Sequence, residues 1–188
     1  MEEWLEFYKP YFSTEDEAIQ FVQDCEKQSP PRNTSKILMH QAQRLISLAD
    51  EVLKIRPYDE SLQVLFLIMC AENIAKLHDR FNGEGQSRVF VRRFFKKFLS
   101  NEDKMTLGCG FIDEYDNLQR SLGFDLVVDM LYKIRCDVVH EGNYKDFYFH
   151  DGIMSILNTN PNVTSNLRLI DVRNIIVRGC IKAVQNRL

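Results

Sequence analysis

A histidine follows an arginine by five positions in the segment 133–142, which reads KIRCDVVHEG. Near neutral pH the imidazole of His140 could take or give a proton, which typically accelerates a reaction about 10²–10⁴-fold. The guanidinium of Arg135 could grip a phosphate through two parallel hydrogen bonds and offset negative charge that grows during the reaction. The two side chains together suit proton transfer at a bound phosphate group.

The pattern Arg-x4-His, in a helix that Gly142 stops, resembles the catalytic motif of the HEPN superfamily (higher eukaryotes and prokaryotes nucleotide-binding). Many members are metal-independent endoribonucleases that act as toxins, phage-defence effectors or RNA-processing enzymes. The superfamily usually has Asn, Asp or His directly after the arginine, whereas this chain has Cys136, followed by Asp137. The resemblance implies that Arg135 and His140 are catalytic. Asp137 is then a candidate orienting residue, with Cys136 beside it in a supporting position.

Helix geometry separates the two candidate catalytic residues. At about 100° per residue, Arg135 lies close to the apolar seam of its helix and His140 lies about 140° away. A two-fold dimer would bring two copies of the motif to one shared groove, which is how the superfamily typically builds its active site. An isologous interface is also the commonest oligomer contact. We therefore expect a homodimer.

A purely structural interpretation of the same residues stays open. Arg135 could be a half-buried arginine paired with Glu72, which lies on another helix and is the candidate anchor for its guanidinium. His140 could be a helix C-terminal residue that the macrodipole favours when it is protonated. Cys136 and His140, four residues apart, could also mimic a thiol–imidazole pair, although no third partner is visible in the sequence.

A second feature is a short helix in which five cations alternate with aromatic residues. Its sequence over 88–98 is RVFVRRFFKKF. The cations could track phosphates in an RNA-binding groove. A membrane-surface or partner-binding helix would look similar, as would an ordinary amphipathic helix with phenylalanine inside and a solvated basic face. The candidate RNA-binding residues are Arg88, Arg92, Arg93, Lys96 and Lys97.

The apolar periodicity predicts an all-α fold, an antiparallel bundle of five to seven helices that is HEPN-like by the resemblance above. The helices are expected over 14–27, 35–55, 59–81, 87–99, from 124 to the stop at 142, and from 166 to the end, with a further helical segment within 101–120. The apolar run 64–71 places the third helix in the centre. Residues 143–165 are expected to be irregular, with 147–149 as a short strand and 158–165 as a loop. The cations of the last helix, among them Arg173, are interpreted as solvated surface.

Composition limits the function classes. The 188 residues suit one domain, 1–188, and 45% hydrophobic residues allow a substantial core. A net charge of −3 provides no global attraction to nucleic acid, so any RNA binding must be local. The five cysteines and four histidines show no metal spacing, so we expect no metal and no cofactor. The N-terminus lacks signal-peptide features and no apolar stretch could span a bilayer, which favours a cytoplasmic protein without membrane contact.

The resemblance to the HEPN superfamily, with the residues that carry it, implies a metal-independent endoribonuclease that cuts single-stranded RNA at a site shared across a homodimer. A role as a toxin or phage-defence effector would imply an antitoxin or nucleotidyltransferase partner. The first alternative is a non-catalytic HEPN-like module that binds a nucleotide or a protein. The second is a purely structural interaction domain.

Overall fold

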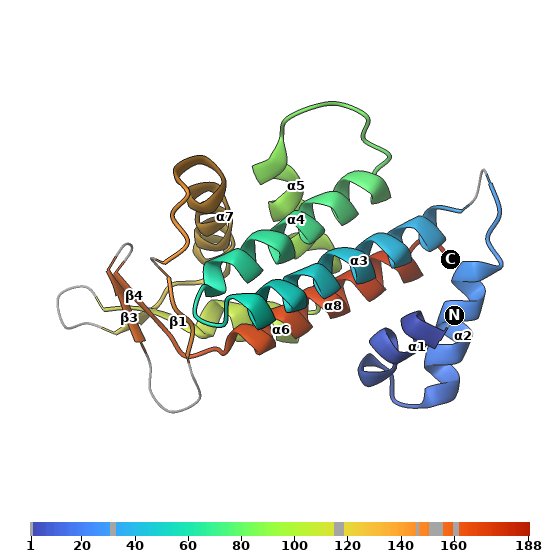
Figure 1. Cartoon of the computed structure of the whole chain (residues 1–188), viewed down its shortest axis with the longest axis horizontal. Coiled ribbons are helices and arrows are strands. Elements are labelled where there is room, and N and C mark those ends of the chain that lie inside the picture. Colours follow the sequence, from blue (N-terminus) through green and yellow to red (C-terminus); the bar gives the residue numbers. More distant parts are fainter. Residues whose placement is uncertain (1, 31–32, 115–118, 146, 151–155, 160–161) are drawn as a thin grey trace.

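The computed structural model describes residues 2–30, 33–114, 119–145, 147–150, 156–159 and 162–188, and this part of the chain is mostly helical (Figure 1). The N-terminal helices are α1 (Glu2–Tyr8), the 3₁₀-helix η1 (Lys9–Tyr11) and α2 (Glu15–Glu26), and they are followed by α3 (Thr34–Ile55), α4 (Glu60–His78), α5 (Ser87–Phe98), α6 (Asn101–Cys109), α7 (Phe124–Glu141) and α8 (Leu169–Gln185). The strands are β1 (Phe111–Asp113), β2 (Arg120–Ser121), β3 (Ile156–Thr159) and β4 (Asn162–Ser165).

The all-α bundle predicted from periodicity is confirmed. Helix α4 is its centre and contacts α3, α5, α7 and α8, while α3 also lies along α8 (Figure 1). Along the predicted apolar run, Leu67, Ile68 and Cys70 are completely buried. A helix that is apolar on most sides is stable only when neighbours cover it on most sides, which explains the central position of α4. The predicted boundaries of these helices agree with the structure to within about three residues.

Local capping explains where the helices begin and end. The hydroxyl of Thr14 accepts from the backbone N–H of Glu17 (3.2 Å), and the Glu17 carboxylate accepts from the backbone N–H of Ser13 (3.0 Å). This reciprocal pair satisfies orphan donors at the start of α2. Helix α7 ends at Gly142, whose φ of 66° is the left-handed conformation that glycine adopts without strain. The predicted stop after His140 is therefore confirmed.

A small antiparallel sheet at one end of the bundle corrects the prediction for its segment. The strand order is β2-β1-β4-β3, so 158–165 is largely a strand pair rather than a loop. Residues 147–149 are not a strand. Their backbone is held instead by the side-chain amide of Asn158, which accepts from the N–H of Tyr148 (2.7 Å) and donates to its C=O (3.0 Å). Part of the predicted irregular segment (146, 151–155 and 160–161) lies outside the described residues.

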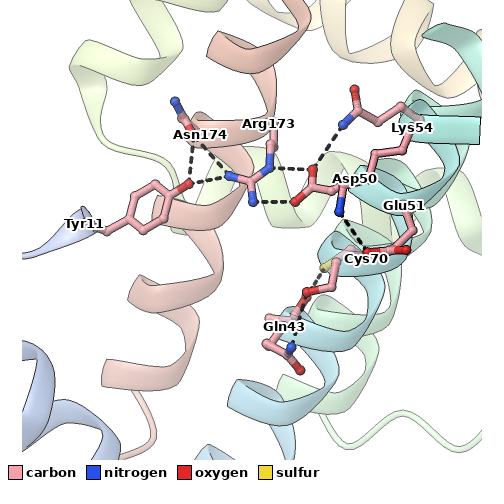
Figure 2. Close-up of polar contacts among 11 residues, drawn as sticks. Tyr11, Gln43, Asp50, Glu51, Lys54, Cys70, Arg173 and Asn174 are labelled. Atoms are coloured by element: carbon pink, nitrogen blue, oxygen red, sulfur yellow. Dashed lines mark hydrogen bonds and ion pairs between the residues drawn. The ribbon is translucent and has the colours of Figure 1, made fainter. Parts of the chain in front are cut away.

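The N-terminal helices, of which only α2 was expected, pack at the opposite end of the bundle from the sheet (Figure 1). Tyr8 is completely buried and donates a hydrogen bond to the C=O of Met39 in α3 (2.6 Å). Figure 2 shows a second attachment, in which Arg173 of α8 holds both Asp50 of α3 and the hydroxyl of Tyr11. Arg173 is thus not a solvated surface residue, contrary to the prediction for the last helix.

Among the described residues, no helix combines the length and the apolar character that crossing a bilayer requires.

Candidate active site

Arg135 lies on the side of α7 that meets α4. Its Nη2 is 3.7 Å from Oε2 of Glu72, and its side chain is only 17% exposed. The guanidinium also lies 5.9 Å from the ring of Tyr132, one turn earlier on α7. Its Nε is buried and has no hydrogen-bond partner in the described part of the chain. Arg135 is therefore held near one carboxylate, and its buried Nε–H is bound by no described residue.

Glu72 is itself held firmly on α4. It is a buried residue, and its Oε1 accepts hydrogen bonds from Lys76 Nζ (2.6 Å) and from the hydroxyl of Ser87 (2.7 Å). Ser87 is the first residue of α5, so one carboxylate joins α4, α5 and α7. The pairing of Arg135 with Glu72, which the sequence offered as the anchor of the site and also as a structural pair, is present. The pairing alone does not decide between the two interpretations.

His140 lies in the last turn of α7 and is exposed. It has no hydrogen-bond or ion-pair partner in the described part of the chain. Both residues lie within the single α-helix α7, so helix geometry sets the two side chains about 140° apart. A single chain thus presents an anchored arginine and an imidazole without a described partner on different sides of the same helix, and it does not bring them together.

Cys136 and Asp137, the two residues directly after Arg135, have different surroundings. Asp137 pairs with Lys133 one turn earlier on α7, with 2.5 Å between Oδ2 and Nζ. Cys136 is half-buried beside Tyr132, and partial burial together with this thiol raises the pKa of the Tyr132 phenol. Among the described residues, Asp137 is bound within its own helix rather than to Arg135 or His140. Its orienting role therefore stays a prediction.

The five cations of α5 are all exposed, and all are paired with carboxylates. Its apolar face is buried in the bundle through Phe90, Phe94, Phe95 and Phe98, so that face is not free to enter a membrane or a partner groove. On the outer face the guanidinium groups of Arg88 and Arg92 both bind Asp129 of α7. The remaining pairs are Lys96 with Asp125 (3.1 Å), Lys97 with Asp79 (3.3 Å), and Arg93 with Asp79 (2.5 Å).

These carboxylates were not among the predicted site residues. Partial burial alone would raise the pKa of Asp79, but hydrogen bonds from Arg93, His78 and Lys97 outweigh it and hold that pKa at about 2. Hydrogen bonds from Arg92 and Arg88 hold the pKa of Asp129 even further below the usual range. Both carboxylates are charged at neutral pH, so they offset part of the positive charge on the basic face of α5. The spacing of Asp125 and Asp129, four residues apart like the cations opposite, was the available sequence signal.

Two hollows in the surface of the described residues lie away from the Arg135–His140 motif. One of about 700 Å³ is bordered by the N-terminal segment, α5, α6 and α8, and one of about 480 Å³ lies near His150 and Arg168. Neither is lined by Arg135 or His140. The described residues contain no group of three or more His, Cys, Asp or Glu side chains that could hold a metal ion. No protein-family model, curated protein or solved structure matches the chain.

Proposed function

We propose that the chain is a metal-independent endoribonuclease of HEPN type that cuts single-stranded RNA. The observation that supports it is the state of its two motif residues. Arg135 is anchored by the buried Glu72 at the contact of α4 and α7, while His140, five residues later, is exposed and without a partner in the described residues. A fixed phosphate-binding cation and a free proton-transfer group are the two parts that the reaction needs.

The chemistry needs only the substrate and these side chains. The 2′-oxygen of the RNA attacks the adjacent phosphorus and loses its proton, while the bond to the 5′-oxygen breaks and that oxygen gains a proton. The products are a 2′,3′-cyclic phosphate and a 5′-hydroxyl. His140 moves one of these protons, and Arg135 binds the non-bridging oxygens of the phosphate as their charge grows.

The reaction can be tested without identifying the natural substrate. We expect purified protein to cleave unstructured RNA in the presence of EDTA and to leave 2′,3′-cyclic phosphate ends, because no step requires a divalent ion. End-group analysis and a labelled substrate measure both results. Cleavage that EDTA abolishes, or 3′-hydroxyl ends, would contradict the proposed chemistry.

The opposed directions of Arg135 and His140 lead us to propose a two-copy site. Val139, which lies between them on the surface of α7, is 48% exposed, so a second chain seated there would bury apolar surface. We expect light scattering at micromolar concentration to give twice the chain mass of 22.1 kDa. A monomeric mass across that range would remove the shared site from the proposal.

A role as a toxin or phage-defence effector, with an antitoxin or nucleotidyltransferase as partner, belongs to the same proposal. The second candidate function is a non-catalytic module that binds a nucleotide or a protein. The ion pairs of α5 favour it, because each of the five cations predicted to bind RNA already has a carboxylate partner. A folded dimer that cleaves no RNA would move the assignment to this module.

A further inference from the structure

One carboxylate lies between two arginine forks on the outer surface of the molecule. Arg88 of α5 donates to Asp129 of α7 through Nε (3.3 Å) and Nη2 (2.7 Å). Arg92, one turn later, donates through the same two nitrogen positions, with 2.7 Å from its Nε. Both arginine side chains are about half exposed, at 55% and 44%. Solvent, and therefore a ligand, can reach the pair.

This arrangement is the one by which arginines hold a phosphate. A guanidinium binds a carboxylate or a phosphate through two parallel N–H groups, and two such forks directed at one anion form a complete oxyanion site. We propose that Arg88 and Arg92 form a binding site for a backbone phosphate of single-stranded nucleic acid, and that the carboxylate of Asp129 occupies this site in the free protein. The inference rests on the proposed function for its substrate class. It adds that the Asp129 carboxylate competes with the phosphate for the two arginines.

The exchange is physically accessible. Both arginine side chains are about half exposed, so water screens part of their attraction to Asp129, and a phosphate in its place can accept the same paired hydrogen bonds. The hydrogen bonds from the two arginines keep the pKa of Asp129 far below neutral. The competitor therefore stays charged at any physiological pH, and only another anion can displace it.

The neighbouring residues point to an extended strand rather than an isolated anion. Lys96 continues the row of Arg88 and Arg92 along α5, with about 6 Å of helix between successive cations. It too is paired with a carboxylate of α7, that of Asp125 (3.1 Å). Repeated cations on one straight helix face suit the repeated phosphates of a backbone.

Helix α7 also connects this row of cations to the motif that contains Arg135. Tyr132 lies one turn after Asp129 and one turn before Arg135, and its ring is 5.9 Å from the guanidinium of Arg135. An aromatic ring beside a phosphate-binding arginine can stack a base of the same strand. A single strand bound across Arg88 and Arg92 would thus continue towards the proposed catalytic arginine.

Removal of the competitor should strengthen binding. In the His140→Ala background, which prevents cleavage by the proposed site, we expect Asp129→Asn to bind a fluorescent oligo-U about two- to tenfold more tightly at 0.15 M salt. The salt dependence should steepen by about 0.7 in logarithmic slope, because one more net positive charge faces the phosphates. Oligo-dT of the same length should gain equally, since the site contacts phosphates.

The matched control is Asp171→Asn on α8, where Arg168 and Asp171 form an exposed pair (2.8 Å). It changes the net charge by the same amount and should alter neither affinity nor slope. An Asp129→Asn variant that melts cooperatively but binds no more tightly than its background would overturn the inference, and so would a gain on anionic vesicles without one on either oligonucleotide. Cleavage is scored separately with His140 intact. Tighter binding without cleavage therefore defeats only the proposed catalysis, and cleavage without tighter binding defeats only this inference.

Discussion

His140→Ala is expected to abolish RNA cleavage and to leave the melting temperature within about 3 °C of the wild type. Loss of the proton-transfer group removes about 10²–10⁴-fold of rate, which takes the reaction to the background of an RNA assay. The stability is preserved because the imidazole is exposed and contacts no polar partner among the described residues. Labelled single-stranded RNA in EDTA measures the first quantity, and a circular-dichroism melt measures the second.

Arg135→Ala should also remove cleavage, at a modest cost in stability. The buried Glu72 keeps its shorter hydrogen bonds from Lys76 and Ser87, so the variant does not leave a carboxylate unpaired. We expect a loss of about 1–2 kcal/mol. Glu141→Ala, an exposed change in the same helical turn as His140, is the matched control and should cleave at the wild-type rate. Equal cleavage by all variants would place the activity in a contaminant or at another site.

Mixing the two inactive variants tests the shared site directly. If each site takes Arg135 from one protomer and His140 from the other, a mixed dimer of Arg135→Ala and His140→Ala contains one intact site. Random reassociation should then restore about a quarter of the wild-type activity. A mixture that exchanges subunits and stays inactive would show that both residues act within one chain, which the geometry of α7 makes difficult.

The long helices could be predicted because their evidence is local and repeated. The positions of Val127, Leu131 and Ile134 follow the helical period, and these side chains are buried in α7 as the period requires. Gly142 indicates the end of this helix, because glycine readily adopts the left-handed conformation that ends a helix. The pairing of Arg135 with Glu72 could be anticipated because both lie at the inner sides of long helices.

The sheet and the partners of α5 could not be derived in this way. Residues 147–149 have the composition of a strand, but the side chain of Asn158 takes the place of a neighbouring strand, and a sequence does not show such a substitution. The sequence shows the cations of α5. Their ion pairs depend on the positions of Asp79 and Asp129 in the folded chain. The charge pattern of one helix therefore predicts the charge of its surface only when the positions of the neighbouring helices are known.

Arg173 shows the same limit in the core. Its Nε and Nη2 bind the two oxygens of Asp50 (2.8 and 2.7 Å), and its Nη1 donates to the hydroxyl of Tyr11 (2.6 Å). That hydroxyl donates to the side chain of Asn174 (2.7 Å), a contact that Figure 2 also shows. The Arg173 side chain is 13% exposed. The sequence of the last helix alone assigns Arg173 to the surface. It does not show that the N-terminal segment packs against this residue.

We expect Arg173→Ala to destabilise the protein by about 2–3 kcal/mol, somewhat less than the loss of a fully buried ion pair because Asp50 is partly solvated. For a chain of this size the melting temperature should fall by about 5–10 °C. Tyr11→Phe, which removes only the hydroxyl, should cost about 1 kcal/mol. Arg168→Ala, which breaks an exposed pair on the same helix, should shift the melting temperature by less than about 2 °C.

The fluorescence of a single tryptophan can show which part of the structure Arg173→Ala destabilises. Trp4 is the only tryptophan, and its ring stacks on His40 of α3 with 4.1 Å between ring centroids. Because Arg173 attaches the N-terminal segment through Tyr11, Arg173→Ala should let Trp4 fluorescence change at a lower temperature than the helical circular-dichroism signal. In the wild type and in Arg168→Ala the two transitions should coincide. Coincident transitions in Arg173→Ala, with an unchanged midpoint, would mean that the buried contact of Tyr8 with α3 alone holds the segment and that the arginine network contributes nothing measurable to its attachment.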